Sequence, residues 1–217
     1  MIKLLRTILF IGVFSLGLLS TANANLEARL GGMVYDDVLD ITWLADANYA
    51  QTSGYDSDGR MNFDEANTWA AGLSYGGYDD WRLPTALNQD GSGPCLGFNC
   101  TGSEMGHMFY NNLGATAGNS ILLGTNTDNL ALFTNLQSSV YWSGTVYAPD
   151  PARYAWNFVT NLGFQDDSDQ SLEFYAWAVR PGDVAAIPEP ETYAMLLAGL
   201  GLLGVAAKWR RRSFGAS

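Results

Sequence analysis

The sequence of 217 residues predicts one compact α+β domain over residues 25–186, with short helices in its first half and antiparallel strands in its second. Its length and its 47% apolar residues suit a single domain with a sizeable core. With 13% aromatic residues and 24 glycines, the chain is too aromatic to be disordered and too rich in glycine to be a helical bundle. Helix-capping patterns come before a stretch rich in Tyr, Trp, Val and Thr, which places helices ahead of strands.

The first expected elements are a hairpin and a helix. Residues 33–35 and 41–44 are short β-rich runs on either side of an acidic turn. Asn62 and Glu65 have the spacing of a capping box, in which each side chain bonds the backbone of the other. The apolar residues that follow share one helical face: Phe63, Ala66, Trp69, Ala70 and Leu73.

A second helix is expected from a capping box formed by Thr101 and Glu104. Gly114 is the expected stop, and His107, the single histidine of the chain, lies on this helix. One side of the helix is apolar: Met105, Met108, Phe109 and Leu113.

Three strands are expected in the last third of the domain. They cover residues 140–146, 153–160 and 172–179, which are rich in β-branched and aromatic residues. Residues 161–163 form the expected turn after the second strand, and the acidic residues 166–169 fall in the loop before the third.

The N-terminus has the pattern of a secretory signal peptide over residues 1–24. Lys3 and Arg6 precede the uncharged run 8–19, and small residues lead to an A-x-A cleavage pattern at residues 22–24. The alternative, a membrane-spanning first helix, needs about 20 apolar residues.

The C-terminus carries a second hydrophobic run, residues 193–207, followed by a basic tail. Cations at that end hold it on the cytoplasmic side of a membrane. Pro188, Glu189 and Pro190 stand before the run and keep the chain extended. The basic tail consists of Lys208, Arg210, Arg211 and Arg212.

This order of elements over residues 187–217 resembles a PEP-CTERM sorting signal. The resemblance implies export in a Gram-negative bacterium, transient insertion of residues 193–207 in the inner membrane, and cleavage by an exosortase. The product would then reach the cell surface or the biofilm matrix. An ordinary C-terminal membrane anchor is the alternative, and in both cases the folded part faces outward.

The exported part is strongly acidic. Residues 25–187 contain five basic residues, all arginine, and twenty acidic ones, so their net charge is −15. A surface with this charge repels phosphate backbones, so we do not expect the protein to bind nucleic acid.

The two cysteines, Cys95 and Cys100, are expected to form a disulfide because export leads to an oxidising compartment. Their spacing also suits metal ligation. A zinc site would lack ligands, since no further cysteine and only His107 are available.

Four phrases, at residues 40–46, 78–85, 141–145 and 176–182, resemble the Lcl C-terminal domain family, which is named after a collagen-like bacterial adhesin. The resemblance implies a fold related to C-type-lectin-like and formylglycine-generating-enzyme-like domains, and in the adhesin a role in binding sulfated glycans. We expect six residues of these phrases to be structural, in the core or in ion pairs: Trp81, Arg82, Pro84, Trp142, Trp177 and Arg180. Arg82 alternatively holds a carboxylate or stacks on a sugar.

Residues 54–65 invite comparison with a twelve-residue calcium loop, because Gly59 falls at its invariant turn. The first ligand position is occupied by Gly54, which cannot serve as a carboxylate ligand. The alternative is a loop of Asx turns that leads into a capped helix. The candidate ligands are Asp56, Asp58, the carbonyl of Arg60, Asn62 and Glu65.

Enzyme functions find little support, and we expect none. No Gly-x-Ser-x-Gly turn is available to partner His107, and the cysteine pair is too close in sequence for copper-oxidase chemistry. A carboxylate pair that cleaves glycosidic bonds stays open, as does a second cation site at residues 166–169.

The sequence therefore predicts a non-catalytic surface or matrix module that binds extracellular polysaccharide or another matrix component. The alternatives are an extracellular enzyme that acts on matrix polysaccharide and a purely structural surface protein. Tyrosines in loop-like stretches are expected either to stack on sugars or to close over the core: Tyr49, Tyr55, Tyr75, Tyr78 and Tyr147.

Overall fold

The structure is a computed structural model that describes residues 26–184. The expected signal peptide, residues 1–24, and the expected sorting signal, residues 187–217, lie outside the described residues. Within residues 26–184, no helix has the length and apolar character needed to cross a membrane.

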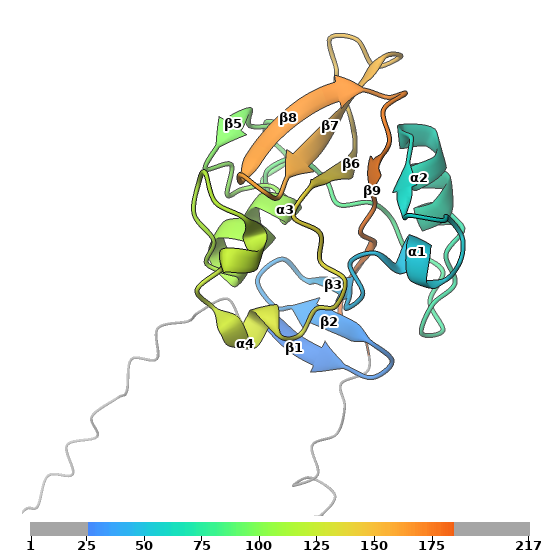
Figure 1. Cartoon of the computed structure of the whole chain (residues 1–217), viewed down its shortest axis with the longest axis vertical. Helices are drawn as coiled ribbons and strands as arrows, with labels where there is room; N and C mark the ends of the chain where they lie inside the picture. Colours follow the sequence, from blue (N-terminus) through green and yellow to red (C-terminus); the bar gives the residue numbers. More distant parts are fainter. Residues whose placement is uncertain (1–25, 185–217) are drawn as a thin grey trace, which may run out of the picture.

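The described chain is a compact mixed α/β domain with many strands and a few short helices, which confirms the predicted class in its broad form (Figure 1). The strands are β1 (Leu26–Arg29), β2 (Met33–Asp36), β3 (Ile41–Leu44), β4 (Arg60–Met61), β5 (Gly97–Phe98), β6 (Val140–Val146), β7 (Tyr154–Val159), β8 (Phe164–Asp169), β9 (Phe174–Tyr175) and β10 (Val179–Pro181). The helices are α1 (Tyr49–Thr52), α2 (Phe63–Ala71), α3 (Glu104–His107) and α4 (Thr127–Leu130). Strands thus occur in both halves of the domain, and α4 lies in the second half.

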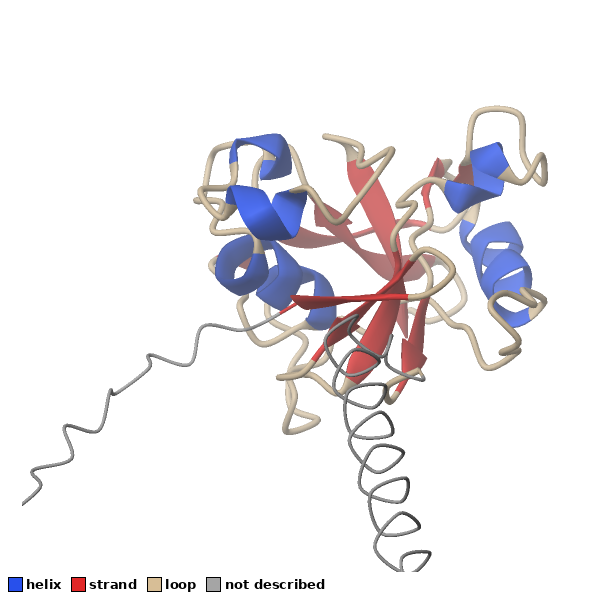
Figure 2. Cartoon of the chain, turned by 90° about the horizontal axis from the view of Figure 1, so that it is seen from below, coloured by secondary structure: helices blue, strands red, loops and turns tan. Residues whose placement is uncertain are grey.

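The strands form two sheets. One has the order β1-β2-β3-β10, and the other has the order β4-β9-β6-β7-β8-β5. Neighbouring strands are antiparallel except β6 and β9, which are parallel. The helices lie in two groups on opposite sides of the strands, α1 and α2 on one side and α3 and α4 on the other (Figure 2).

The predicted opening hairpin is present as β2 and β3, which pair from Met33 with Leu44 to Asp36 with Ile41. The last described strand, β10, pairs with β3. Arg29 on β1 holds the Asp183 carboxylate with two bonds, of 2.8 and 2.9 Å. The beginning and the end of the described chain are therefore tied together.

The single strand predicted at residues 172–179 is wrong. The chain leaves the larger sheet after β9 and joins the smaller sheet as β10. Between them, residues 176–178 are completely buried. The Trp177 ring lies 4.7 Å from that of Trp43, and its Nε1 donates to the Leu44 carbonyl at 2.7 Å. Burial of this side chain between the sheets decides the path against the strand propensity of the segment.

The strand prediction at residues 140–146 matches β6, and the prediction at 153–160 matches β7 within one residue at each end. The prediction of a loop at residues 166–169 is wrong, because these residues belong to β8. Six residue pairs join β7 and β8, from Tyr154 with Asp169 to Val159 with Phe164. This ladder outweighs the low strand propensity of aspartate.

The capping box that begins α2 is confirmed. Asn62 accepts from the Glu65 backbone N–H, and Glu65 accepts from the Asn62 backbone N–H. The helix then buries one apolar face: Phe63, Ala66, Trp69 and Ala70.

The second predicted helix is shorter and differently capped. Ser103, instead of Thr101, is the N-cap, and its hydroxyl accepts from the Gly106 N–H. Glu104 turns away to Arg82, so it cannot complete a capping box. The α3 helix passes at Met108–Asn112 into a π-helical turn, and Gly114 follows at a φ of 66°. The predicted apolar side is buried.

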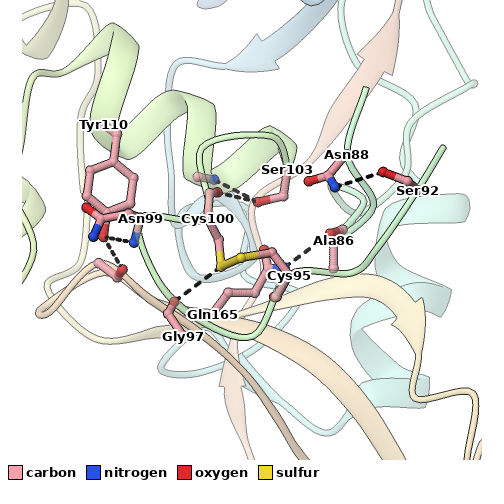
Figure 3. The surroundings of a disulfide bond; sticks show 12 residues. Ala86, Asn88, Ser92, Cys95, Gly97, Asn99, Cys100, Ser103, Tyr110 and Gln165 are labelled. Carbon is pink, nitrogen blue, oxygen red and sulfur yellow. Dashed lines mark hydrogen bonds between the residues drawn. A yellow bond between two sulfur atoms is a disulfide. The ribbon is translucent and has the colours of Figure 1, made fainter. Parts of the chain in front are cut away.

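The expected disulfide is formed between Cys95 and Cys100 (Figure 3). It closes the loop that carries β5, the edge strand beside β8. Gln165 on β8 donates to the Cys95 carbonyl at 2.7 Å and to the Ala86 carbonyl at 3.1 Å. The disulfide loop is therefore anchored to the larger sheet.

Replacing both cysteines with Cys95→Ser and Cys100→Ser should lower the free energy of unfolding by about 2 kcal/mol, because the unfolded chain gains the entropy that so short a crosslink removes. Urea denaturation of the variant and the wild type measures this difference. Reductant should destabilise the wild type to a similar degree and leave the variant unchanged. Equal stability of oxidised wild type and variant would contradict this role.

Candidate functional site

Two surface cavities lie next to each other, because Thr85 lines both. The smaller has a volume of about 380 Å³ and the larger about 470 Å³. The smaller is lined by Asn67, Arg82, Leu83, Thr85, Gly144 and Thr145. The larger is lined by Val38, Leu39, Thr85, Leu87, Asn88, Gln89, Gly91, Gly102 and Glu104.

An ion pair between Arg82 and Glu104 joins the two cavities. Arg82 Nη1 and Nη2 donate to the two carboxylate oxygens of Glu104 at 2.8 and 2.7 Å. Burial alone would lower the pKa of the Arg82 guanidinium, but the hydrogen bonds and the charge of Glu104 outweigh it and raise that pKa. Arg82 therefore stays cationic at the wall of the smaller cavity.

The segment that carries Arg82 is held by backbone and core contacts. Arg82 and Val179 exchange two backbone hydrogen bonds of 2.8 Å each, so residue 82 pairs with the start of β10. The side chains of Trp81, Leu83 and Pro84 are buried on either side of it. Burial of these neighbours places the guanidinium at the surface side of the segment.

Thr85 and Thr145 form the shared wall of the site. Their hydroxyl oxygens lie 3.2 Å apart, and Thr145 Oγ1 also accepts from the Ala86 N–H at 3.0 Å. Thr145 lies in an irregular part of β6, between its pairs at Trp142 and Val146 with β7. A β-bulge of this kind redirects side chains, and here it presents the Thr145 hydroxyl to the cavity.

The other residues singled out from the four phrases have structural contacts. Arg180 forms a bidentate pair with Asp80, at 2.7 and 3.0 Å, and its guanidinium stands 4.1 Å from the centre of the Tyr78 ring. Trp142 is fully buried and donates from Nε1 to the Met61 carbonyl at 2.9 Å. These contacts join segments far apart in the sequence.

The structure does not bring the calcium candidates together as a site. Asp56 accepts from the backbone N–H groups of Asp58 and Gly59, and Asp58 accepts from that of Arg60. Burial would raise the pKa of Asp56, but these backbone donors hold it below its ordinary value.

Asn62 and Glu65 are engaged in the capping box of α2. Among the described residues, no group of three His, Cys, Asp or Glu side chains is arranged to hold a metal ion. The loop is therefore a series of Asx turns leading into a capped helix, which was the alternative interpretation.

Most of the candidate tyrosines close over the core. Tyr55 is 54% exposed, whereas Tyr49, Tyr75 and Tyr78 pack partly buried against the core. Tyr147 is half-buried against Tyr154 and Trp156. The five tyrosines as a group therefore do not offer exposed rings on which sugars could stack.

A buried polar cluster, which the sequence analysis missed, surrounds His107. Asp36 is fully buried and accepts from Asn112 Nδ2 at 2.6 Å, and Asn129 donates to the Asn112 carbonyl. His107 is 6% exposed, and its Nε2 has no hydrogen-bond partner among the described residues. His107 lines neither cavity.

The uncharged polar residues of the cavity walls were not predicted from the sequence. Asn67, Thr85 and Thr145 were not singled out, although Thr85 and Thr145 each end one of the four phrases. The signal that could have identified Thr85 and Thr145 is their position at the end of a phrase that contains tryptophan. Asn67 gave no signal of its own, because it looks like any exposed position of an amphipathic helix.

A family model described as the PEP-CTERM protein-sorting motif matches residues 186–212. The match includes Pro188, Glu189 and Pro190 and the basic tail, and it confirms that part of the predicted resemblance. The motif indicates an exported, exosortase-sorted surface protein whose precursor is anchored in a membrane.

No curated protein and no solved structure shows significant similarity to the chain. The resemblance to the Lcl C-terminal domain family thus finds no support, and the lectin-like fold that it implied is not confirmed.

The stability of the protein should fall as the pH falls from about 7 to 5.5. Burial lowers the pKa of His107 in the folded state, and the nearby Asp36 carboxylate and Asn112 amide only partly oppose it. Below about pH 6.5 the unfolded chain binds a proton at His107 more readily than the folded chain does, so the unfolding free energy decreases as the pH falls.

Urea midpoints of the wild type and His107→Leu measure this pH dependence. His107 is the single histidine, and the variant should lack the decrease between pH 7 and 5.5. The pKa values of Asp80 and Asp183 are lowered by hydrogen bonds with their arginine partners, so these groups reduce stability only at more acidic pH. A decrease of the same size in His107→Leu would contradict the assignment.

Proposed function

We propose that the folded domain is a non-catalytic module that binds an extracellular polysaccharide or another matrix component across the two cavities beside Thr85. We further propose that the producer is a Gram-negative bacterium and that cleavage by an exosortase releases the protein to the cell surface or the biofilm matrix. The observation that carries it is the presence of amide and hydroxyl side chains in the lining of two adjacent cavities, which the Arg82–Glu104 pair joins.

The lining suits sugar hydroxyl groups. Asn67, Asn88 and Gln89 contribute amides, and Thr85 and Thr145 contribute hydroxyls. Amides and hydroxyls both donate and accept hydrogen bonds, as sugar hydroxyls do. Two neighbouring cavities also suit a polymer, since successive sugar units can occupy them in turn.

The acidic groups favour binding over catalysis. Glu104 is the one carboxylate among the described residues that line the cavities. It accepts two bonds from Arg82 and a third, of 2.7 Å, from the Thr85 N–H. Glycoside cleavage needs a pair of carboxylates, one to donate a proton and one to attack or to activate water. The lining residues offer one carboxylate, and it is already engaged.

The charge of the domain limits the class of polymer. Five arginines and twenty acidic residues leave residues 25–187 with a net charge of −15. Densely sulfated chains are repelled by such a surface. Polysaccharides that carry at most one negative charge per sugar unit are the ligands that the domain suits best.

Binding of the full chain, purified in mild detergent, to immobilised polysaccharides should be saturable, including to polymer from the producing organism's own matrix. Gln89→Ala and Asn67→Ala, one in each cavity, should each weaken binding about fivefold through loss of an amide hydrogen bond. Asn161→Ala is the matched control, because Asn161 is exposed and lines neither cavity. The same binding assay, run in calcium and in EDTA, tests whether the loop that contains Asp56 contributes to polysaccharide binding.

Absence of binding to every polymer by the folded protein would overturn the proposal and favour a purely structural surface protein. An equal loss in Asn161→Ala would show that the cavities are not the site. Release of reducing ends from a bound polymer would instead favour the enzymatic alternative.

A further inference from the structure

We infer that the smaller cavity is a carboxylate subsite, so that the polysaccharide bound by this domain contains uronic acid. The inference rests on the proposed function and names the ligand class of the same site. It depends on how the donors of Arg82 are used, on the other groups in the cavity, and on the space left by Gly144.

Arg82 has one complete edge of its guanidinium available. Glu104 takes one N–H each of Nη1 and Nη2, and the Leu83 carbonyl accepts from Nη1 at 3.0 Å. The Nε–H and the second N–H of Nη2 have no hydrogen bond among the described residues. These two N–H groups lie side by side on the guanidinium and match the two oxygens of a carboxylate.

The Arg82 side chain, which carries this edge, is partly exposed at the smaller cavity. The Arg82 side chain is 40% exposed and lines the smaller cavity, whereas Glu104 is 11% exposed and lines the larger one. Glu104 is therefore the more buried partner of the pair, and its hydrogen bonds fix the orientation of the guanidinium. Preorganisation of this kind reduces the entropy lost when a ligand binds.

The remaining polar groups of the smaller cavity supply further donors, beside the acceptor Oδ1 of Asn67. Asn67 uses one N–H for the Phe63 carbonyl, at 2.8 Å, and keeps the other. The hydroxyls of Thr85 and Thr145 share one proton between them and accept from the backbone N–H groups of Leu87 and Ala86. One of the two hydroxyl protons lies in the bond between Thr85 and Thr145, and the other is free to donate to a ligand. Together with the free edge of Arg82, these donors suit a group that only accepts hydrogen bonds, such as a carboxylate.

Gly144 leaves the space that a ligand needs. A Cβ atom at this position would stand 3.4 Å from the Leu83 Cβ and 3.7 Å from Asn67 Oδ1, between two residues of the cavity wall. A larger side chain at position 144 would therefore extend into the cavity. Its backbone lies in β6 and takes no positive φ, so a substitution is compatible with the strand.

The acidity of the domain and an anionic ligand group are compatible at physiological salt. Long-range repulsion is screened over about 8 Å at 0.15 M, whereas the direct bidentate contact acts at hydrogen-bond distance. Repulsion grows with the charge density of the polymer, which favours one carboxylate per sugar unit over several sulfates.

The test compares polygalacturonate with its methyl ester, in which the carboxylates are neutral and the sugar backbone is unchanged. Dextran and dextran sulfate complete the set, and the full chain is used at 0.15 M salt. Polygalacturonate should bind at least tenfold more tightly than the methyl ester and more tightly than dextran sulfate.

Two cavity variants and one control assign the binding to this subsite. Arg82→Lys keeps the charge but loses the two-donor edge, and Gly144→Leu extends into the cavity while the Arg82 and Glu104 side chains themselves are unchanged. Each should weaken polygalacturonate binding at least tenfold, with thermal unfolding measured to show that the variant is folded. Arg153→Lys is the matched control, because Arg153 is an exposed arginine paired with Asp169 and should bind as the wild type does.

Equal binding of polygalacturonate and its methyl ester, or unchanged binding by folded Gly144→Leu, would overturn the carboxylate assignment. Dextran binding as tight as polygalacturonate binding, and weakened by Gln89→Ala, would overturn it while the proposed function stands. Failure to bind any polymer would overturn both.

Discussion

Packing of Trp177 between the two sheets is the contact on which the rest of the domain depends. Its ring lies within 6.0 Å of the rings of Trp43, Phe133 and Tyr141, and its Nε1 bonds the Leu44 carbonyl. Trp43 and Leu44 belong to β3 near the start of the described chain, whereas Phe133 and Tyr141 lie about a hundred residues later. Because residues 176–178 are fully buried as they pass from β9 to β10, the crossing joins both sheets into one core.

The candidate site follows from this crossing. Once β10 is placed beside β3, its first residue, Val179, pairs with the backbone of Arg82 and orients the segment that bounds both cavities. Glu104 then meets Arg82 from the start of α3, and Thr145 meets Thr85 from the irregular part of β6. The site thus combines three segments that the core brings together.

The few arginines have separate structural tasks. Arg29, Arg82, Arg153 and Arg180 each hold a carboxylate, and Arg60 donates to the Glu173 carbonyl. Five arginines cannot neutralise twenty acidic residues, so the domain stays strongly negative and repels densely charged polyanions. The C-terminal sorting motif and the disulfide agree with this picture, since both belong to a protein that works outside the cytoplasm.

The sequence by itself determined the features that depend on neighbours along the chain. The capping box at Asn62, the hairpin of β2 and β3, the extent of β6, the disulfide and the sorting motif all rest on short spacings or local hydrogen bonds. Tertiary structure decided the break at residues 176–178, the strand at residues 166–169 and the cavities. These depend on which distant segments pair and on which side chains become buried, and local propensity carries no information about either.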